Sequence, residues 1–247
     1  MEITTERIQI PLEGGGSMGG YLARPVGDGA RPAVIVFMEI FGINSHIREV
    51  TERIAREGYV AIAPDYFHRT GPGAEYGYDD EGFAKGMALL NQLRADEMIA
   101  DARATISYLE GQAFVADDRI GCMGFCIGGH MTYLTACEMP VRASVSFYGG
   151  GIAAPEGPGG GPSTLGRTEK ISGRILCLFG AEDGFIPVEQ AEQIREALRT
   201  SGVRHDIVIY PGADHGFFCD QRGTYQKAAA EDAWSRVKDF FGETLGD

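Results

Sequence analysis

The chain has 247 residues, of which 44 % are hydrophobic and 23 % are charged. This balance is typical of a globular protein and excludes a disordered or collagen-like one. At this length, roughly 70–75 % of the surface of the unfolded chain can be buried, which is enough for one large core. We therefore expect a single domain over residues 1–247. Thirty-five acidic and 22 basic residues give a net charge of −13, which argues against nucleic-acid and anionic-membrane partners.

The start of the chain and its cysteines indicate the cellular compartment. The first ten residues include acidic side chains and lack the apolar core of an export signal, and no window approaches 18 consecutive apolar residues. The five cysteines are odd in number and have no repeated spacing, so we expect free thiols rather than a disulfide framework. These features predict a soluble, cytoplasmic protein, and a monomer is the starting hypothesis.

The pattern of apolar residues predicts the order of the elements. Residues 2–12 and 18–24 alternate apolar and polar positions around the glycine run 14–16, which predicts an antiparallel hairpin at a sheet edge. Continuous apolar runs predict buried strands at 33–38, 59–63, 119–123, 143–148, 175–179 and 207–210. Helical spacing predicts helices at 46–57, 93–110, 127–137, 188–200 and 225–245. This order predicts a mostly parallel, doubly wound α/β sheet with helices on both faces and sites beyond the carboxyl ends of its strands.

Two stretches lack strong periodicity. Residues 68–80 follow a strand end and could line a pocket. The stretch 149–162 is so rich in glycine and proline that we expect a mobile surface loop, which is a candidate lid.

The segment from Gly124 to Gly128 carries the strongest chemical signal. Its sequence, G-F-C-I-G, is the G-x-S-x-G nucleophile elbow with Cys126 in the place of serine. A nucleophile on a sharp strand-to-helix turn has a strained backbone, and side chains two residues before and after it would collide with neighbouring segments. The elbow also puts the nucleophile at a helix N-terminus, which favours a thiolate and a developing oxyanion.

An acid and a histidine follow this elbow in the order that such a hydrolase requires. Asp183 and His215 each come just after a predicted strand. His215 would take the proton of Cys126, and Asp183 would orient the imidazole and stabilise its charged form. The backbone N–H groups of Ile127 and Ile40 would hold the oxyanion, since Ile40 lies in the loop after the first parallel strand.

The chain resembles the dienelactone hydrolases (carboxymethylenebutenolidases), which have the α/β-hydrolase fold. The resemblance covers about residues 8–241. It rests on residues 39–42, 63–65, 124–129, 147–149, 180–183 and 215–217. It implies the same triad and oxyanion donors, no cofactor, and opening of a lactone or ester through a thioester at Cys126, as in the conversion of 4-carboxymethylenebut-2-en-4-olide to maleylacetate.

The resemblance also implies a role for Glu39, whose family counterpart hydrogen-bonds the resting thiol and swings away when substrate arrives. A carboxylate beside the sulfur disfavours the thiolate by like-charge repulsion, so its departure would favour a Cys–His ion pair.

The family binds the carboxylate of its substrate with two arginines. Arg69 matches the first, and would give this acidic protein the local positive charge that an anionic substrate needs. Cys219 stands where the family has the second, and Arg222 is the nearest replacement. This departure opens the possibility of a broader carboxylesterase or lactonase. Tyr148 matches a family tyrosine near the pocket, although it can equally be a core aromatic residue at a strand end.

Two other functions use the same residues. Cys126, His215 and Cys219 could be drawn as metal ligands, but no second pair with zinc spacing supports a metal site, and we expect none. Alternatively, the pocket could bind a ligand without catalysis, or Cys126 could sense oxidants. The presence of Asp183 and His215 in hydrolase order favours catalysis, because a sensor needs neither.

Overall fold

The computed structural model describes residues 1–246, in which strands and helices alternate along the chain. The strands are β1 (Ile3–Pro11), β2 (Ser17–Pro25), β3 (Arg31–Phe37), β4 (Val60–Pro64), β5 (Val115–Phe125), β6 (Ala143–Phe147), β7 (Glu156–Gly157), β8 (Gly161–Pro162), β9 (Arg174–Gly180) and β10 (Arg204–Tyr210). The helices are α1 (Ser45–Arg56), α2 (Asp80–Leu90), α3 (Ala95–Glu110), α4 (Ile127–Glu138), α5 (Val188–Thr200), α6 (Lys227–Leu245) and a 3₁₀ helix (Leu165–Lys170).

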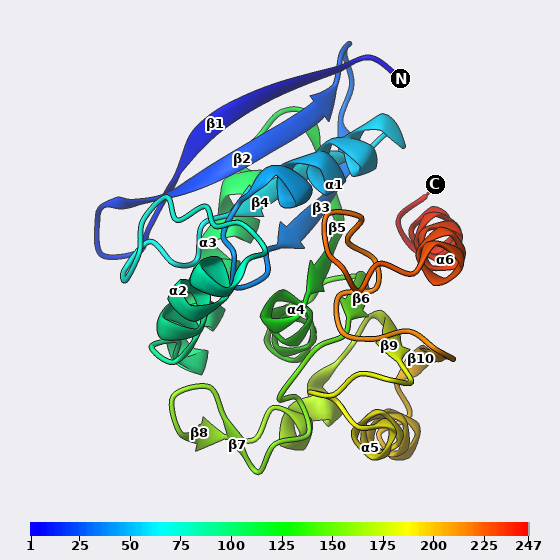
Figure 1. The fold of residues 1–247 in the computed structure, drawn as a ribbon. Coiled ribbons are helices and arrows are strands. Elements are labelled where there is room, and N and C mark those ends of the chain that lie inside the picture. Colours follow the sequence, from blue (N-terminus) through cyan, green and yellow to red (C-terminus); the bar gives the residue numbers. More distant parts are fainter. Residues whose placement is uncertain (247) are drawn as a thin grey trace.

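Eight of the strands form one twisted sheet in the order β1-β2-β4-β3-β5-β6-β9-β10 (Figure 1). β1 and β2 pair in antiparallel fashion at one edge, and β2 is also antiparallel to β4. The other neighbours are parallel. The predicted edge hairpin and the predicted mostly parallel sheet are therefore confirmed.

Helices cover both faces of this sheet. Figure 1 shows α1 and α6 on one side, and α4 and α5 on the other. The central strands β3, β4 and β6 are mostly apolar and almost wholly buried, as expected for strands covered on both faces. Side chains from both faces and from the strands between them form a continuous apolar core. None of the helices in residues 1–246 combines the length and apolarity needed to cross a membrane.

Helix α2 was not predicted from the sequence, because two of its eleven residues are glycines, which disfavour helices. Its position on the molecule explains them. A Cβ atom at Gly82 would lie 2.1 Å from the carbonyl oxygen of Gly77, and one at Gly86 would lie 2.5 Å from that of Ile40. Gly86 therefore lets α2 lie directly against the loop that follows β3, and Gly82 lets the segment before α2 fold closely onto its first turn. The gain from this packing outweighs the low helix propensity.

The stretch 149–162 is more ordered than the sequence predicts. It contains the short antiparallel ribbon β7–β8, and Ile152 within it is fully buried. His130 on α4 ties it to the core, because its Nδ1 lies 2.8 Å from the carbonyl oxygen of Gly150 and its Nε2 lies 2.8 Å from Oγ1 of Thr164. A carbonyl only accepts, so Nδ1 carries the proton and Nε2 accepts from the hydroxyl. The stretch is therefore not purely a surface loop as expected, since Ile152 is buried and β7 pairs with β8; its predicted mobility stays a prediction.

The His130 anchor predicts a pH dependence of stability. Burial lowers the pKa of His130 to about 4. The unfolded chain therefore binds a proton at this residue below about pH 6.5 that the folded chain does not bind until about pH 4. Stability should fall by about 3 kcal/mol through this residue as the pH drops across that window.

Urea unfolding of the wild type and of His130→Gln between pH 7.5 and 4 measures this effect. The variant should be less stable at neutral pH and should lose less stability on acidification. His205→Gln, which replaces a half-exposed histidine of β10, is the control. If the wild type and His130→Gln lose equal free energies of unfolding between pH 7.5 and 4, the prediction is contradicted.

Candidate active site

Cys126 lies at the turn between β5 and α4 with φ 57° and ψ −121°, a conformation that non-glycine residues rarely adopt. The two flanking glycines make the turn possible. A Cβ atom at Gly124 would lie 2.2 Å from the carbonyl oxygen of Gly128, and one at Gly128 would lie 2.3 Å from that of Phe37. The steric reason given for the elbow spacing is therefore confirmed. The turn leaves Cys126 partly exposed at the N-terminus of α4.

Asp183 and His215 form a buried pair beyond the ends of β9 and β10. Nδ1 of His215 lies 2.8 Å from Oδ2 of Asp183. The other oxygen of Asp183 accepts hydrogen bonds from the backbone N–H groups of Phe185 and Ile186, at 2.8 and 3.1 Å. Three donors thus hold the carboxylate in place. Its bond to Nδ1 directs the other nitrogen of the imidazole, Nε2, away from Asp183.

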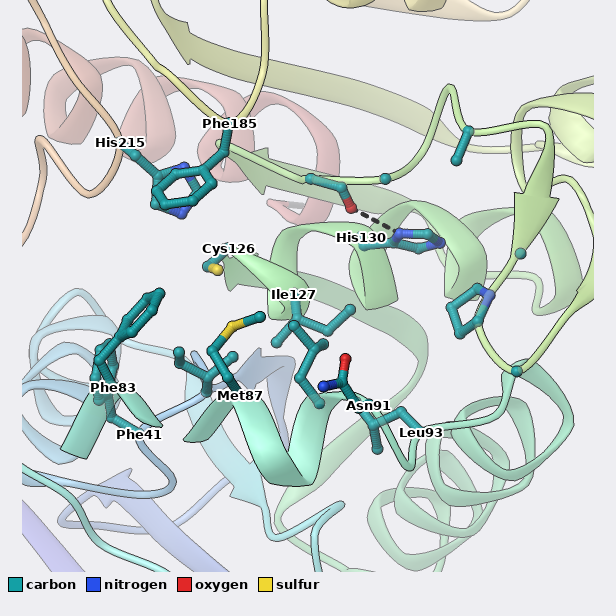
Figure 2. Close-up of a pocket in the computed structure, with 18 of the residues that line it drawn as sticks. Phe41, Phe83, Met87, Asn91, Leu93, Cys126, Ile127, His130, Phe185 and His215 are labelled. Carbon is teal, nitrogen blue, oxygen red and sulfur yellow. Dashed lines mark hydrogen bonds between the residues drawn. The ribbon is translucent and has the colours of Figure 1, made fainter. Parts of the chain in front are cut away.

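Cys126 and His215 line the same cavity, and Figure 2 shows them near one another on one side of it. Burial alone would lower the pKa of His215. The negative charge of Cys126, a side-chain hydrogen bond with Cys126 and the bond to Asp183 outweigh burial and raise this pKa to about 10. The imidazole of His215 is therefore charged at neutral pH where it lines the cavity with Cys126.

Two backbone N–H groups are available beside this sulfur. Ile127 is the first residue of α4, so its N–H has no acceptor within the helix. The N–H of Ile40 makes no hydrogen bond within residues 1–246. Both residues line the cavity with Cys126. They are therefore free to donate to an oxyanion.

Glu39 was expected to hydrogen-bond the resting thiol of Cys126, but within residues 1–246 it has other partners. Its Oε1 accepts from Nη1 of Arg222 at 3.0 Å, and its Oε2 accepts from the hydroxyl of Tyr78 at 3.1 Å. Glu39 is fully buried and the side chain of Arg222 is largely buried. The carboxylate of Glu39 is thus paired with an arginine from the loop after β10.

Arg69 is not brought to the cavity. Its guanidinium makes two hydrogen bonds, of 2.7 and 2.9 Å, to the buried carboxylate of Asp101 on α3. The position of Arg69 therefore does not fit the expected role in substrate binding. Tyr148 lies beneath the site rather than in it, since it is fully buried and its ring centroid is 5.1 Å from that of His215. Arg222 does line the cavity.

The cavity has a volume of about 480 Å³ and a mostly apolar wall. Sequence reasoning missed most of this wall. Phe83, Met87 and Leu90 come from the unpredicted helix α2, although their spacing on one helical face was a usable signal. Phe185 covers His215 edge-on with ring centroids 5.2 Å apart, and it is 66 % exposed. Residues of the stretch 149–162 close another side.

No group of three His, Cys, Asp or Glu side chains in residues 1–246 is placed to hold a metal ion. All five cysteines are free thiols, and Cys126 is the one that is not buried.

Comparison with known proteins agrees with this arrangement. A family model described as the dienelactone hydrolase family matches residues 18–245. The chain is 48 % identical over 246 residues to a Synechocystis protein named "Putative carboxymethylenebutenolidase", with 99 % of each chain covered. An Escherichia coli protein of the same name is 36 % identical, with 96 % of this chain and 86 % of that one covered. A crystal structure titled "Putative Dienelactone Hydrolase" from Klebsiella pneumoniae superposes with a TM-score of 0.89 at 33 % identity, covering 98 % of this chain and 100 % of that one.

The close packing at the elbow predicts the effect of one added methyl group. Gly128→Ala should destabilise the protein by about 2 kcal/mol or more, because its Cβ atom would overlap backbone atoms that cannot move aside. Gly242→Ala on α6 is the matched control, since its Cβ atom would meet nothing within 4 Å. It should be neutral or stabilise by up to about 1 kcal/mol. Thermal and urea unfolding measure both, and equal stability of the two variants would contradict the packing argument.

Proposed function

Since the chain belongs to the dienelactone hydrolase family and has the α/β-hydrolase fold, we propose that it hydrolyses small carboxylic esters or lactones through a covalent thioester at Cys126. One observation supports this proposal above the others. The imidazole of His215 is bonded at 2.8 Å to Asp183 and has its pKa raised by Cys126. An acid bonded to a base that shares a cavity with a nucleophile provides the groups that acyl transfer needs.

In the first half of the reaction, the sulfur of Cys126 attacks the carbonyl carbon and the electron pair of the C=O bond moves to oxygen. The N–H groups of Ile40 and Ile127 donate to this oxyanion. When the C–O ester bond breaks, His215 gives its proton to the leaving oxygen. The product is a thioester. If the substrate is a lactone, the freed hydroxyl stays attached to the acyl group.

In the second half, water attacks the thioester carbonyl while His215 takes one of its protons. The C–S bond then breaks, the thiolate returns, and the carboxylic acid leaves and loses its proton to solvent. Asp183 keeps Nδ1 of the imidazole protonated, so that Nε2 faces the reacting atoms in both halves. This cycle uses only side chains and backbone groups of the chain and consumes one water molecule for each ester.

The thioester can be detected directly. Rapid mixing of the wild type with p-nitrophenyl acetate should give a burst of about one p-nitrophenolate per chain, and mass spectrometry of the quenched protein should place an acetyl group on Cys126.

Cys126→Ala should abolish both the burst and turnover, while Cys137→Ala, which alters a buried thiol at the other end of α4, should leave them unchanged. Normal turnover by Cys126→Ala would overturn the proposed function. Ligand binding or oxidation of Cys126 that survives His215→Ala, without any hydrolysis by the wild type, would favour a binding or sensing role.

The raised pKa of His215 predicts the pH profile of kcat/KM, which reports the free enzyme. The charged imidazole protonates the leaving group and persists to about pH 10. Activity should therefore hold through pH 9 and fall near pH 10. Asp183→Asn removes one contribution to that pKa, so the alkaline limb should move to lower pH and kcat/KM should fall on the order of 100-fold.

Asp214→Asn provides the control, because Asp214 accepts from the backbone N–H of His215 at 2.6 Å and an amide oxygen can do the same. Its alkaline limb should match that of the wild type. An unshifted limb in Asp183→Asn would contradict the assignment.

A further inference from the structure

The cavity extends well beyond the reacting groups, and one part of it is apolar. Figure 2 shows the wall running from Cys126 past Ile127 and Met87 toward Leu93, on the side away from His215. We call this part the apolar arm; its apolar side chains are Met87, Leu90, Leu93, Ile127, Ala154 and Pro158, and the polar side chains of Asn91 and His130 line the cavity next to it. Helix α2 bounds it on one side and the stretch 149–162 on the other. A cavity of about 480 Å³ is far larger than an acetyl group requires.

The charges around the cavity disfavour an anion in this arm. Arg222 is a cation that lines the cavity, and it already pairs with buried Glu39 at 3.0 Å. Burial keeps the pKa of His130 near 4, so His130 is neutral at pH 7. Glu156, an exposed carboxylate, adds negative charge to the lining. Arg69, expected to hold a substrate carboxylate, is bound to Asp101 instead. The charged imidazole of His215 lies at the other end of the cavity and is bonded to Asp183. None of the residues that form the arm is a cation, so a carboxylate that enters it would lose its hydration without gaining an ion pair there.

The chemistry decides which half of the substrate enters the arm. His215 protonates the leaving group, so the alcohol part must lie on the side of His215 and Phe185, where the cavity is exposed. The acyl part stays bonded to Cys126. It extends away from His215, and the route along Ile127 leads into the apolar arm, while Phe41 and Phe83 form a separate wall.

We propose that this enzyme selects esters with a neutral, apolar acyl group longer than acetyl, and that the apolar arm is its acyl subsite. This inference rests on the proposed function and adds its substrate class. The expected substrate is then an ester with a neutral, hydrophobic acyl group rather than a small anionic lactone.

A series of p-nitrophenyl esters with one leaving group tests the length preference. From acetate through butanoate to hexanoate, kcat/KM should rise about two- to fourfold for each added methylene group, as expected for burial of apolar surface. The adipate mono-p-nitrophenyl ester has a hexanoyl-length chain that ends in a carboxylate. Its kcat/KM should be at least about tenfold below that of the hexanoate, because its charge must be desolvated.

Two variants and a control locate the subsite. Leu90→Trp should lower the hexanoate-to-acetate ratio of kcat/KM at least about tenfold, because the indole fills the arm. Ala88→Trp places the same bulky side chain at an exposed position of α2 and should leave the hexanoate-to-acetate ratio of kcat/KM unchanged. Glu156→Lys is on an exposed position that can change without loss of folding. It should raise the adipate-to-hexanoate ratio at least about threefold by supplying the missing cation.

The outcomes separate the two proposals. If acetate turnover depends on Cys126 but kcat/KM stays flat or falls with acyl length, or if the adipate ester is preferred, the acyl subsite is wrong and the proposed function stands. If Leu90→Trp and Ala88→Trp change the ratio equally, or Glu156→Lys leaves the adipate ratio unmoved, the arm is not the subsite. If no ester gives Cys126-dependent turnover, both proposals fall.

Discussion

The close contact between the start of α4 and the end of β3 is the constraint on which the site depends. Gly128 packs its bare Cα against the carbonyl oxygens of Phe37 and Met38, and this contact sets how near the elbow lies to the loop after β3. That distance brings the N–H groups of Ile127 and Ile40 to the same cavity as the sulfur of Cys126. On the other side of the same loop, Gly86 of α2 packs on the carbonyl oxygen of Ile40. Gly128 on α4 and Gly86 on α2 thus pack against the start and the middle of the loop after β3, which lies between the two helices.

Charge neutralisation is the second organising feature. The chain carries a net charge of −13, yet its cavity pairs the buried charges one by one. Glu39 is held by Arg222 and Tyr78, and Asp183 by His215 and two backbone N–H groups. Removing one partner from a buried ion pair typically costs about 3–5 kcal/mol, so Arg222 is not readily released to bind a substrate anion. The ion pair between Arg222 and Glu39 therefore stabilises the site and also disfavours anionic substrates.

Local patterns predicted much of this arrangement. The six parallel strands and the edge hairpin follow from apolar runs and alternation, and Cys126, Asp183 and His215 follow from an elbow spacing and from positions just after strands. The features that were not predicted have a common physical cause: contacts between residues far apart in the sequence determine them. Helix α2 forms despite Gly82 and Gly86 because those glycines allow close packing. Ile152 anchors a glycine-rich stretch through contacts with the core. Arg69 comes after residues 63–65, as in the family, but its guanidinium binds the carboxylate of Asp101, which lies 32 positions further along the chain.

The reactivity of the five cysteines tests the central claim most directly. Burial raises the pKa of Cys122, Cys137 and Cys219 to about 12 and that of Cys177 further, whereas Cys126 is partly exposed beside a charged imidazole. Limiting iodoacetamide, followed by peptide mapping, should label Cys126 alone. At pH 7 the labelling rate should drop at least about tenfold in His215→Gln, because the charged imidazole that favours the reactive form of the sulfur is lost. Faster labelling of any other cysteine, or a labelling rate that is the same in the wild type and His215→Gln, would contradict activation of Cys126 by the charged imidazole of His215.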